Sequence, residues 1–418
     1  MRTVSEVAGS EPGSSTALVD QVGIGVLTRL VSRELVEETV AAAGRREKRV
    51  RLLPARVVVY FVMAMALFHG DAYEEVIRKL VHGLRGLWIW RNEWTVPTSG
   101  ALTQARQRLG AQVMRDLFFR VAVPCARRST QGAWLGRWRL MAIDGFEVEM
   151  PDTSHNAERY GYSGKKNNDK GVFPKMLVTG LAECGTHAII AAELGAWRDT
   201  EITLATRLLS SGVVSDDMLV IGDRGMYSNR HLHLIKDAGA EALFRVKVNV
   251  LLPVLQWFDD GSYLSYSADP RARTPAASQR LAAGTMKVTE LPGVYIRVIE
   301  YEVPNRGDDE LFTLVTTICD PLDAPAVELA AAYHERWEIE TAIGELKTHQ
   351  KGAGVLLRSK SPEMVEQELW GMLLTHYGIR QLMAEAADQA DIDPDRLSFI
   401  RSLRIIRRHV GGPADFSP

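Results

Sequence analysis

The stretch that decides the fold is YHERWEIETAIGELKTHQK, residues Tyr333 to Lys351. It contains no proline and one glycine, and its content of Glu, Ala, Leu and Lys predicts one continuous α-helix. On a helical wheel that advances about 100° per residue, one carboxylate, three basic side chains and a phenol share an arc of about 60°. These residues are Tyr333, Arg336, Glu340, Lys347 and Lys351. A carboxylate surrounded by basic groups on one helix face indicates a surface that binds phosphates and a metal ion.

Two aspartates upstream of this helix follow short apolar runs. Asp144 comes directly after LMAI, residues 140–143, and Asp223 lies in GDRG, residues 222–225, after another apolar run. In an open sheet, catalytic groups collect at the C-terminal ends of strands, where side chains project into a crevice. Asp beside Gly is commonly a turn former, so each aspartate taken alone favours a turn over a catalytic role. The combination with Glu340 favours catalysis.

The spacing within residues 333–351 resembles the Y-R-E-K signature of the insertion-sequence-4-type DDE transposases, carried here by Tyr333, Arg336, Glu340 and Lys347. Three further segments are similar to this family: ELKTHQKG (345–352), LRSKSPEMVEQELWG (357–371) and HYGIR (376–380). The resemblance covers almost the whole chain, from about residue 22 onward. The family pattern includes two upstream aspartates on strands, and this chain supplies both.

The resemblance implies that Asp144, Asp223 and Glu340 are catalytic and bind metal. The expected cofactor is a pair of Mg²⁺ ions, for which Mn²⁺ can substitute, since these hard cations prefer carboxylate oxygens. Two such ions about 4 Å apart activate the attacking oxygen and stabilise the departing oxyanion. By the same resemblance, Asp144 bridges both ions, while Asp223 and Glu340 each bind one.

The resemblance also assigns roles to the basic residues of the Y-R-E-K stretch. Tyr333 and Arg336 are expected to hold a phosphate near the scissile bond. Lys347 is expected to neutralise another phosphate, and Lys351 joins them as a DNA-binding residue. The implied reaction is cut-and-paste DNA transposition: metal-dependent hydrolysis at element ends, then attack of each 3′-hydroxyl on target DNA. The implied partners are double-stranded DNA, as terminal inverted repeats and target, and a second copy of the chain in the synaptic complex.

The order of predicted elements indicates an α/β fold: a ribonuclease-H-like mixed sheet with a β-rich insertion, preceded by an α-helical N-terminal domain. From about Arg137 the sequence reads as three strands, a helix, a strand, a helix and a strand. Pro, Gly and Asp breaks then separate alternating runs. The predicted parts are a disordered lead-in (1–20), a helical DNA-binding domain (21–130), a catalytic domain (131–249 and 321–418) and the insertion (250–320).

One N-terminal segment combines a helix start signal with basic residues. VPTSGALTQARQRLG, Val96 to Gly110, predicts a helix capped by Thr98 or Ser99. A basic helix in a small helical domain suits docking in the DNA major groove. A helix that only packs on the core is an equal alternative. Three polar residues are expected on the exposed side: Gln104, Arg106 and Arg108.

Overall composition gives weaker guidance. A net charge of −2 and a pI of about 6.6 do not by themselves indicate DNA binding, although basic residues concentrate near positions 45–56, 120–139 and 401–408. The three cysteines form no CxxC pair, which indicates a reducing compartment and argues against structural zinc. The longest apolar run, Val57 to Phe68, is too short to span a bilayer and predicts a buried helix. We therefore expect a cytoplasmic bacterial protein, associated with the nucleoid when bound to DNA.

Two alternatives stay open. A ribonuclease-H-like nuclease without strand transfer would use the same three carboxylates, and only the helical N-terminal domain and the Y-R-E-K stretch argue against it. A domesticated DNA-binding protein that no longer cuts DNA is expected to have lost a carboxylate, which this chain has not.

Overall fold

The structure is a computed structural model. The predicted lead-in, residues 1–20, lies outside the part of the chain that it describes. The described residues are 28, 31–47, 53–84, 95–164, 170–247, 250, 252–302 and 311–410.

The centre of the molecule is a mixed sheet with the strand order β5-β4-β2-β6-β7. β2 pairs antiparallel with β4, and β4 with β5, whereas β6 runs parallel to both β2 and β7. The helix α9 (Glu201–Leu209) precedes β6, and α10 (Asn229–Asp237) follows it. This is the order of a ribonuclease-H-like core, so the predicted fold class is confirmed. The strands are β2 (Trp138–Glu149), β4 (Lys170–Glu183), β5 (Ala188–Ala196), β6 (Met218–Gly222) and β7 (Glu241–Arg245).

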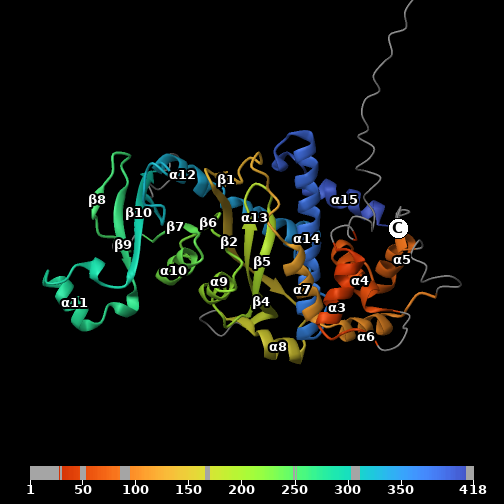
Figure 1. The fold of residues 1–418 in the computed structure, drawn as a ribbon. Coiled ribbons are helices and arrows are strands. Elements are labelled where there is room, and N and C mark those ends of the chain that lie inside the picture. Colours follow the sequence, from red (N-terminus) through yellow and green to blue (C-terminus); the bar gives the residue numbers. More distant parts are fainter. Residues whose placement is uncertain are drawn as a thin grey trace, which may run out of the picture.

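Four more strands extend the sheet beyond β7 in the antiparallel order β11-β10-β9-β8. Together with α11 (Pro275–Ala282) they form one end of the molecule (Figure 1). The insertion is therefore β-rich, as predicted, and it continues the central sheet. Its elements are β8 (Gln256–Trp257), β9 (Tyr263–Ala268), η1 (Pro270–Ala272), η2 (Val288–Glu290), β10 (Gly293–Glu302) and β11 (Leu311–Thr316). Two short strands pair with the core: β1 (Trp134–Leu135) with β2 and β3 (Tyr162–Gly164) with β4.

Helices form the opposite end of the molecule (Figure 1). α4 (Ala55–Leu67) is apolar all round, and every residue from 57 to 67 is buried, as the sequence predicts. No helix in the described residues is long and apolar enough to cross a membrane. The other helices before the sheet are α3 (Arg33–Ala42), α5 (Tyr73–Leu84), α6 (Ser99–Leu109) and α7 (Ala111–Val121), and α8 (Ser154–Tyr160) follows β2.

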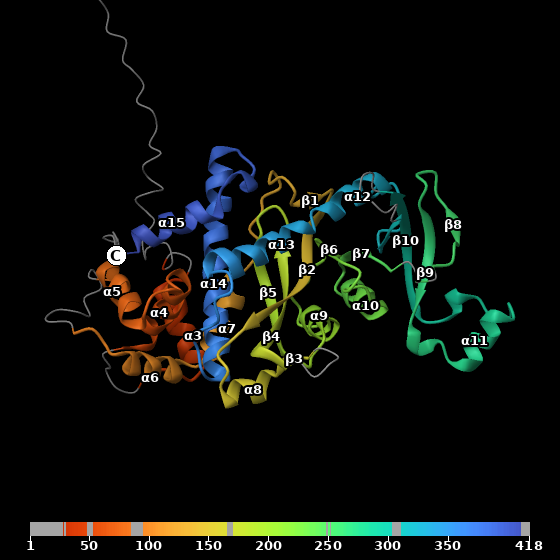
Figure 2. The same cartoon turned by 180° about the vertical axis from the view of Figure 1, so that it is seen from behind.

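After β11 the chain returns across the sheet through α12 (Ala326–His334) and α13 (Trp337–Gly344), as Figure 2 shows. α13 packs on β2, β4 and β5. The long helix α14 (Pro362–Ala390) then runs between the sheet and the N-terminal helices, in contact with β5, α4 and α7. The remaining elements are η3 (Glu345–Gln350), η4 (Pro394–Arg396) and α15 (Phe399–His409).

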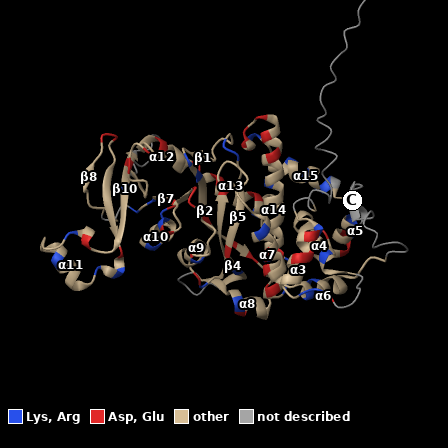
Figure 3. Ribbon diagram, viewed as in Figure 1, with Lys and Arg blue, Asp and Glu red and all other residues tan. Residues whose placement is uncertain are grey.

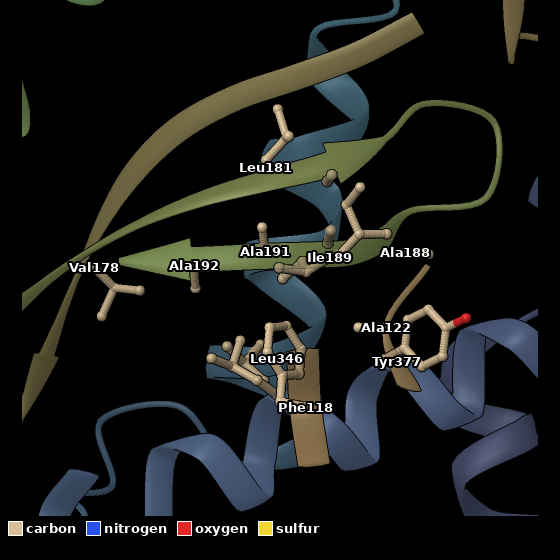
Figure 4. Close-up of a cluster of buried hydrophobic side chains, with 14 of the residues drawn as sticks. Phe118, Ala122, Val178, Leu181, Ala188, Ile189, Ala191, Ala192, Leu346 and Tyr377 are labelled. Carbon is tan, nitrogen blue, oxygen red and sulfur yellow. The ribbon is translucent and has the colours of Figure 1, made fainter. Parts of the chain in front are cut away.

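The core that joins these layers is apolar and continuous. Phe118 of α7 and Tyr377 of α14 lie below Ile189 of β5, with Leu346 of η3 beside Phe118 (Figure 4). All four side chains are buried in one hydrophobic cluster. Because this cluster includes residues of α7, α14 and β5, the N-terminal helices are attached to the sheet through α14.

Arg106 departs from its prediction as an exposed basic residue. It is 2% exposed, because α6 turns it toward α14. Its Nε donates to Gln367 Oε1 at 2.9 Å, and its Nη2 donates to Ser359 Oγ at 3.0 Å. Thr98 caps α6 as predicted, and Gln104 is exposed. Arg106 therefore attaches the N-terminal helices to the C-terminal part of the chain rather than facing solvent.

We expect Arg106→Met to lower the free energy of unfolding by about 3 kcal/mol, because the buried acceptors of Gln367 and Ser359 lose their charged donor. Urea unfolding followed by circular dichroism measures this change. Gln104→Met, at an exposed position of the same helix, is the matched control and should stay within about 0.5 kcal/mol of the unsubstituted protein. Equal midpoints for the two variants would contradict a structural role for Arg106.

Candidate active site

Asp144 lies in the middle of β2, not at the end of a strand as predicted. The parallel pairing of β2 with β6 stops at the pair Ile143 and Gly222, whereas the pairing of β2 with β4 continues through Asp144 and Gly180 to Glu149. Asp144 is therefore the first residue of β2 beyond the C-terminal end of β6. Asp144 thus lies beside the end of the neighbouring strand β6, and the sequence of β2 alone does not show this.

Asp223 follows β6 directly and is held by the turn that it begins. Its Oδ1 accepts hydrogen bonds from the backbone N–H groups of Gly225 (2.7 Å) and Met226 (3.1 Å). The preceding Gly222 is required by close packing, because a Cβ there would lie 2.5 Å from the ring of Phe244. Asp223 thus occupies the strand end that the sequence predicts, beside the position of Asp144.

The stretch that carries Glu340 is not one continuous α-helix. α12 ends at His334, α13 begins at Trp337, and from Glu345 the chain forms the π-helical segment η3. A π-helix has more residues per turn than an α-helix, so a wheel of constant period misplaces the residues beyond Glu345. The predicted arc therefore holds for Arg336 and Glu340 on α13, but it does not determine the directions of the later lysines.

Arg336 links two of the three acids. Its Nη1 lies 2.8 Å from Glu340 Oε1 and 3.8 Å from Asp144 Oδ2. The Arg336 side chain is only 10% exposed, and although this burial lowers its pKa, the hydrogen bond and charge of Glu340 outweigh it and raise the pKa overall. The guanidinium thus stays charged between the carboxylates of β2 and α13.

The carboxyl of Asp144 is the electrostatic centre of the group. Burial raises its pKa to about 6; the backbone N–H of Gly145 opposes the rise, and the charges of Asp223 and Glu340 add to it. Two carboxylates thus destabilise the ionised form of a third, and the Gly145 N–H and the charge of Arg336 partly offset this effect. A divalent cation would offset this repulsion, and carboxylate oxygens are the ligands that hard cations prefer. The donor set therefore fits such an ion.

The three acids do not form a closed set of ligands as they stand. They are not among the groups of side chains in the described residues whose ligand atoms gather closely enough to hold an ion. The guanidinium of Arg336 binds Glu340 and lies near Asp144. An ion bound by all three carboxylates would compete with this guanidinium for Glu340.

Tyr333 lies at the end of α12, beside the same group. It is buried, and this burial raises the pKa of its hydroxyl to about 12, with Arg336 and Arg245 opposing the rise and Asp223 adding to it. The hydroxyl therefore stays neutral at physiological pH and can donate a hydrogen bond to an anion. The electrostatic influence of Arg336 and Asp223 places Tyr333 within the site that the sequence predicts.

Lys347 and Lys351 lie further along, in η3 and just after it. Lys351 Nζ donates to the backbone oxygen of Val355, and burial followed by repulsion from Lys347 lowers its pKa. The two lysines are thus close enough to repel each other, and no contact in the described residues joins either of them to the three acids.

A fourth carboxylate, Glu201, was not identified from the sequence. A Cβ at Gly145 would lie 2.7 Å from Glu201 Oε1, so this side chain rests against the strand beside Asp144. Burial raises the pKa of Glu201, and the charges of Asp223 and Glu147 add to the rise. In the sequence Glu201 looks like an ordinary first-turn acid after the cap Thr200. Only the packing of α9 against β4 and β5, which brings Glu201 to Gly145, reveals it.

Comparison with known proteins identifies the family of this chain. The family model described as insertion element 4 transposase N-terminal matches residues 21–119, and that of the transposase DDE domain matches residues 138–377, more than half of the chain. Transposase InsG for insertion sequence element IS4, from Escherichia coli K12, is 28% identical over 381 residues, 90% of this chain and 80% of that protein. The putative transposase InsZ from the same organism is 26% identical over 49% of this chain and 65% of its own length.

Among solved structures, a piggyBac transposase synaptic complex with hairpin DNA aligns with a TM-score of 0.47 and 11% identity, over 96% of this chain and 83% of that one.

The raised pKa of Asp144 predicts a dependence of stability on pH in metal-free buffer. In the folded protein its pKa of about 6 exceeds the ordinary value of 3.8. The protonated Asp144 carboxyl therefore contributes to the free energy of unfolding below about pH 4, and this contribution is lost as the pH rises through 6. We expect Asp144→Asn to be more stable than the unsubstituted protein by about 1–2 kcal/mol at pH 8 and equal to it near pH 4.

Thermal unfolding in EDTA, measured across this pH range, tests the expectation. Asp237→Asn removes an exposed carboxylate at the end of α10 and should show no such pH-dependent gain. A constant difference between Asp144→Asn and the unsubstituted protein at all pH values would contradict the assignment of the shift to Asp144.

Proposed function

The chain belongs to the transposase DDE domain family, and we propose that it moves DNA by a cut-and-paste reaction. It is a DNA transposase: an enzyme that binds DNA and, as its family implies, depends on divalent metal ions. In the proposed reaction it hydrolyses phosphodiester bonds at the element ends and joins each freed 3′-hydroxyl to target DNA. The observation that carries the proposal is the electrostatic coupling of Asp144 to Asp223, Arg336 and Glu340 beside the C-terminal end of β6, inside the matched region.

We assign the catalytic and metal-binding roles to Asp144, Asp223 and Glu340, and the metal to Mg²⁺. When bound, two such ions would activate the attacking oxygen and stabilise the leaving oxygen. We assign to Asp144 a contribution to both metal positions, and its electrostatic coupling to both Asp223 and Glu340 supports this assignment. The backbone N–H groups of the turn after β6 keep the Asp223 carboxylate oriented for this task.

We assign phosphate binding to Arg336 and Tyr333. The guanidinium of Arg336 is a planar fork that can bind a phosphate through two parallel hydrogen bonds, so it can exchange Glu340 for the DNA backbone. This exchange would release Glu340 to the metal at the moment when DNA enters. The neutral hydroxyl of Tyr333 would donate to the same phosphate, and Lys347 with Lys351 would neutralise phosphates further along the strand.

The remaining parts of the chain fit a division of labour. We propose that residues 21–130 recognise the element ends, that residues 131–249 and 321–418 form the catalytic domain, and that residues 250–320 form an insertion that extends the DNA-binding surface. Because two element ends must be cut together, we propose that two copies of the chain pair them. In this arrangement the protein is associated with the bacterial nucleoid when it is bound to DNA.

A plasmid excision assay tests the reaction and the triad together. The substrate carries the DNA that flanks this gene as element ends, with Mg²⁺ in the buffer. We expect excision by the unsubstituted protein and a fall of at least about 10²–10³-fold for Asp144→Ala, Asp223→Ala and Glu340→Ala, since each removes a group that stabilises transition-state charge. Asp237→Ala is the control for an exposed acid on the same domain.

The alternatives make different predictions in this assay. Binding of the ends without cleavage by the unsubstituted protein would leave a DNA-binding relative. Cleavage without joining of the ends to a target would leave a nuclease. Excision that survives a triad substitution would overturn the assignment of that residue.

The proposed role of Arg336 gives a graded prediction. We expect Arg336→Ala to lower single-turnover cleavage by about 10²–10³-fold, and Arg336→Lys to fall between it and the unsubstituted protein, because Lys keeps the charge but loses the fork. The salt dependence of end binding should also become shallower by about one phosphate contact in Arg336→Ala. An unchanged salt dependence with reduced cleavage would instead restrict Arg336 to holding Glu340.

A further inference from the structure

A second set of metal-binding side chains lies behind the catalytic helix. His187, Glu338 and Asp395 each offer a ligand atom, and these atoms lie within 4.8 Å of one another. Glu338 is two positions before Glu340 on α13, so the two carboxylates point to opposite sides of the helix. The group is therefore separate from the catalytic acids, although it shares their helix.

His187 is held in an unusual position and its ring is almost fully buried. It lies between β4 and β5 with a backbone φ of 55°, in the left-handed region that residues other than glycine rarely adopt. Its side chain is 5% exposed. The buried Nε2 lies 3.0 Å from Asp395 Oδ1 and against a carboxylate oxygen of Glu338, so it faces two carboxylates.

The opposite side of the ring faces a buried arginine and its carboxylate partner. Nδ1 contacts Arg380 Nη2, and Glu345 Oε1 lies 3.8 Å from Nδ1. These two side chains hold the ring in place from this side. Glu345 is itself held by Arg380, whose Nε donates to Glu345 Oε2 at 2.8 Å.

The surroundings of the group carry an excess of negative charge. Three carboxylates, those of Glu338, Asp395 and Glu345, surround the His187 ring. Arg380 forms an ion pair with Glu345. Acidic residues also gather at the end of α14 that leads to η4 (Figure 3). The cluster therefore contains more carboxylates than nearby cations to balance them.

We propose that His187 Nε2, Glu338 and Asp395 bind a divalent transition-metal cation of the Zn²⁺ class. One imidazole and two carboxylates suit such a cation, whereas Mg²⁺ prefers oxygen ligands alone. Three protein ligands leave a fourth tetrahedral position for water. The Asp395 side chain is 42% exposed, so the ion has a path from solvent.

This site holds the catalytic helix without taking part in the reaction. It joins the turn between β4 and β5, the helix α13 and the short helix η4, which are distant in sequence. A bound ion would fix the rotation of α13 about its axis and thereby the position of Glu340 on the other side. The site goes beyond the transposition reaction and does not depend on it.

The test uses the full chain with the catalytic acids removed, as Asp144→Asn with Asp223→Asn, so that ions bound there do not contribute. After EDTA treatment, isothermal titration with Zn²⁺ should show one equivalent bound, and 5 mM Mg²⁺ should not compete. The melting temperature should rise by about 5 °C when Zn²⁺ is about 100 times above its Kd. Co²⁺ should give d–d absorption bands from a site with nitrogen and oxygen ligands.

Two further substitutions in this background locate the ion. Asp395→Asn, at the partly exposed ligand, and His187→Gln should each weaken Zn²⁺ binding at least about tenfold and remove the Co²⁺ bands. Asp391→Asn is the matched control in the same loop; its backbone φ of 52° is one that Asn tolerates, and binding should be unchanged. Absence of a bound equivalent, or binding that survives both ligand substitutions, would overturn the proposal and leave His187 as a protonated partner of the carboxylates.

Discussion

The ion pair between Arg336 and Glu340 decides how three carboxylates share one end of the sheet. Without a cation between them, Asp144, Asp223 and Glu340 repel one another, and the raised pKa of Asp144 measures that repulsion together with its burial. Arg336 is the positive group that is fixed among them. Its burial strengthens its interaction with the carboxylates and makes the removal of this side chain costly. In the function that we propose, a metal ion replaces the guanidinium beside Glu340 when DNA phosphate binds Arg336.

A second buried pair fixes the helix from the side opposite the reaction. Glu345 accepts hydrogen bonds from Arg380 Nε at 2.8 Å and contacts His376 Nε2 at 3.2 Å. Burial alone would raise the pKa of Glu345, but hydrogen bonds with His187 and His376 and the charge of Arg380 outweigh it and hold this pKa well below its usual range. This anchored residue is where α13 changes into the π-helical η3, so the irregular turn coincides with the strongest electrostatic attachment of the stretch.

α14 is the element that connects these features to the rest of the chain. It carries Arg380 and His376 toward the catalytic helix and Gln367 toward Arg106 of the N-terminal helices. The same helix packs on β5 through Tyr377 and its apolar neighbours (Figure 4). A rotation of α14 would therefore affect both the helices proposed to recognise DNA ends and the helix that carries Glu340. The insertion strands stand apart from this connection, because they extend the opposite edge of the sheet.

The sequence by itself determined the family, the order of strands and helices and the candidate acids, because these depend on local periodicity and on motif spacing. Thr98 as a cap, Val57–Leu67 as a buried helix and Asp223 at a strand end are all local properties, and the structure agrees with each. Only the tertiary structure decided that β6 ends beside Asp144, that Arg106 is buried, and that Glu201 rests against Gly145. It also decided the π-helical turn and the meeting of His187, Glu338 and Asp395, since contacts between segments far apart in the chain produce both. A periodic pattern indicates which face of a helix or strand is apolar, but it does not indicate which charged residue from a distant part of the chain will contact that helix or strand.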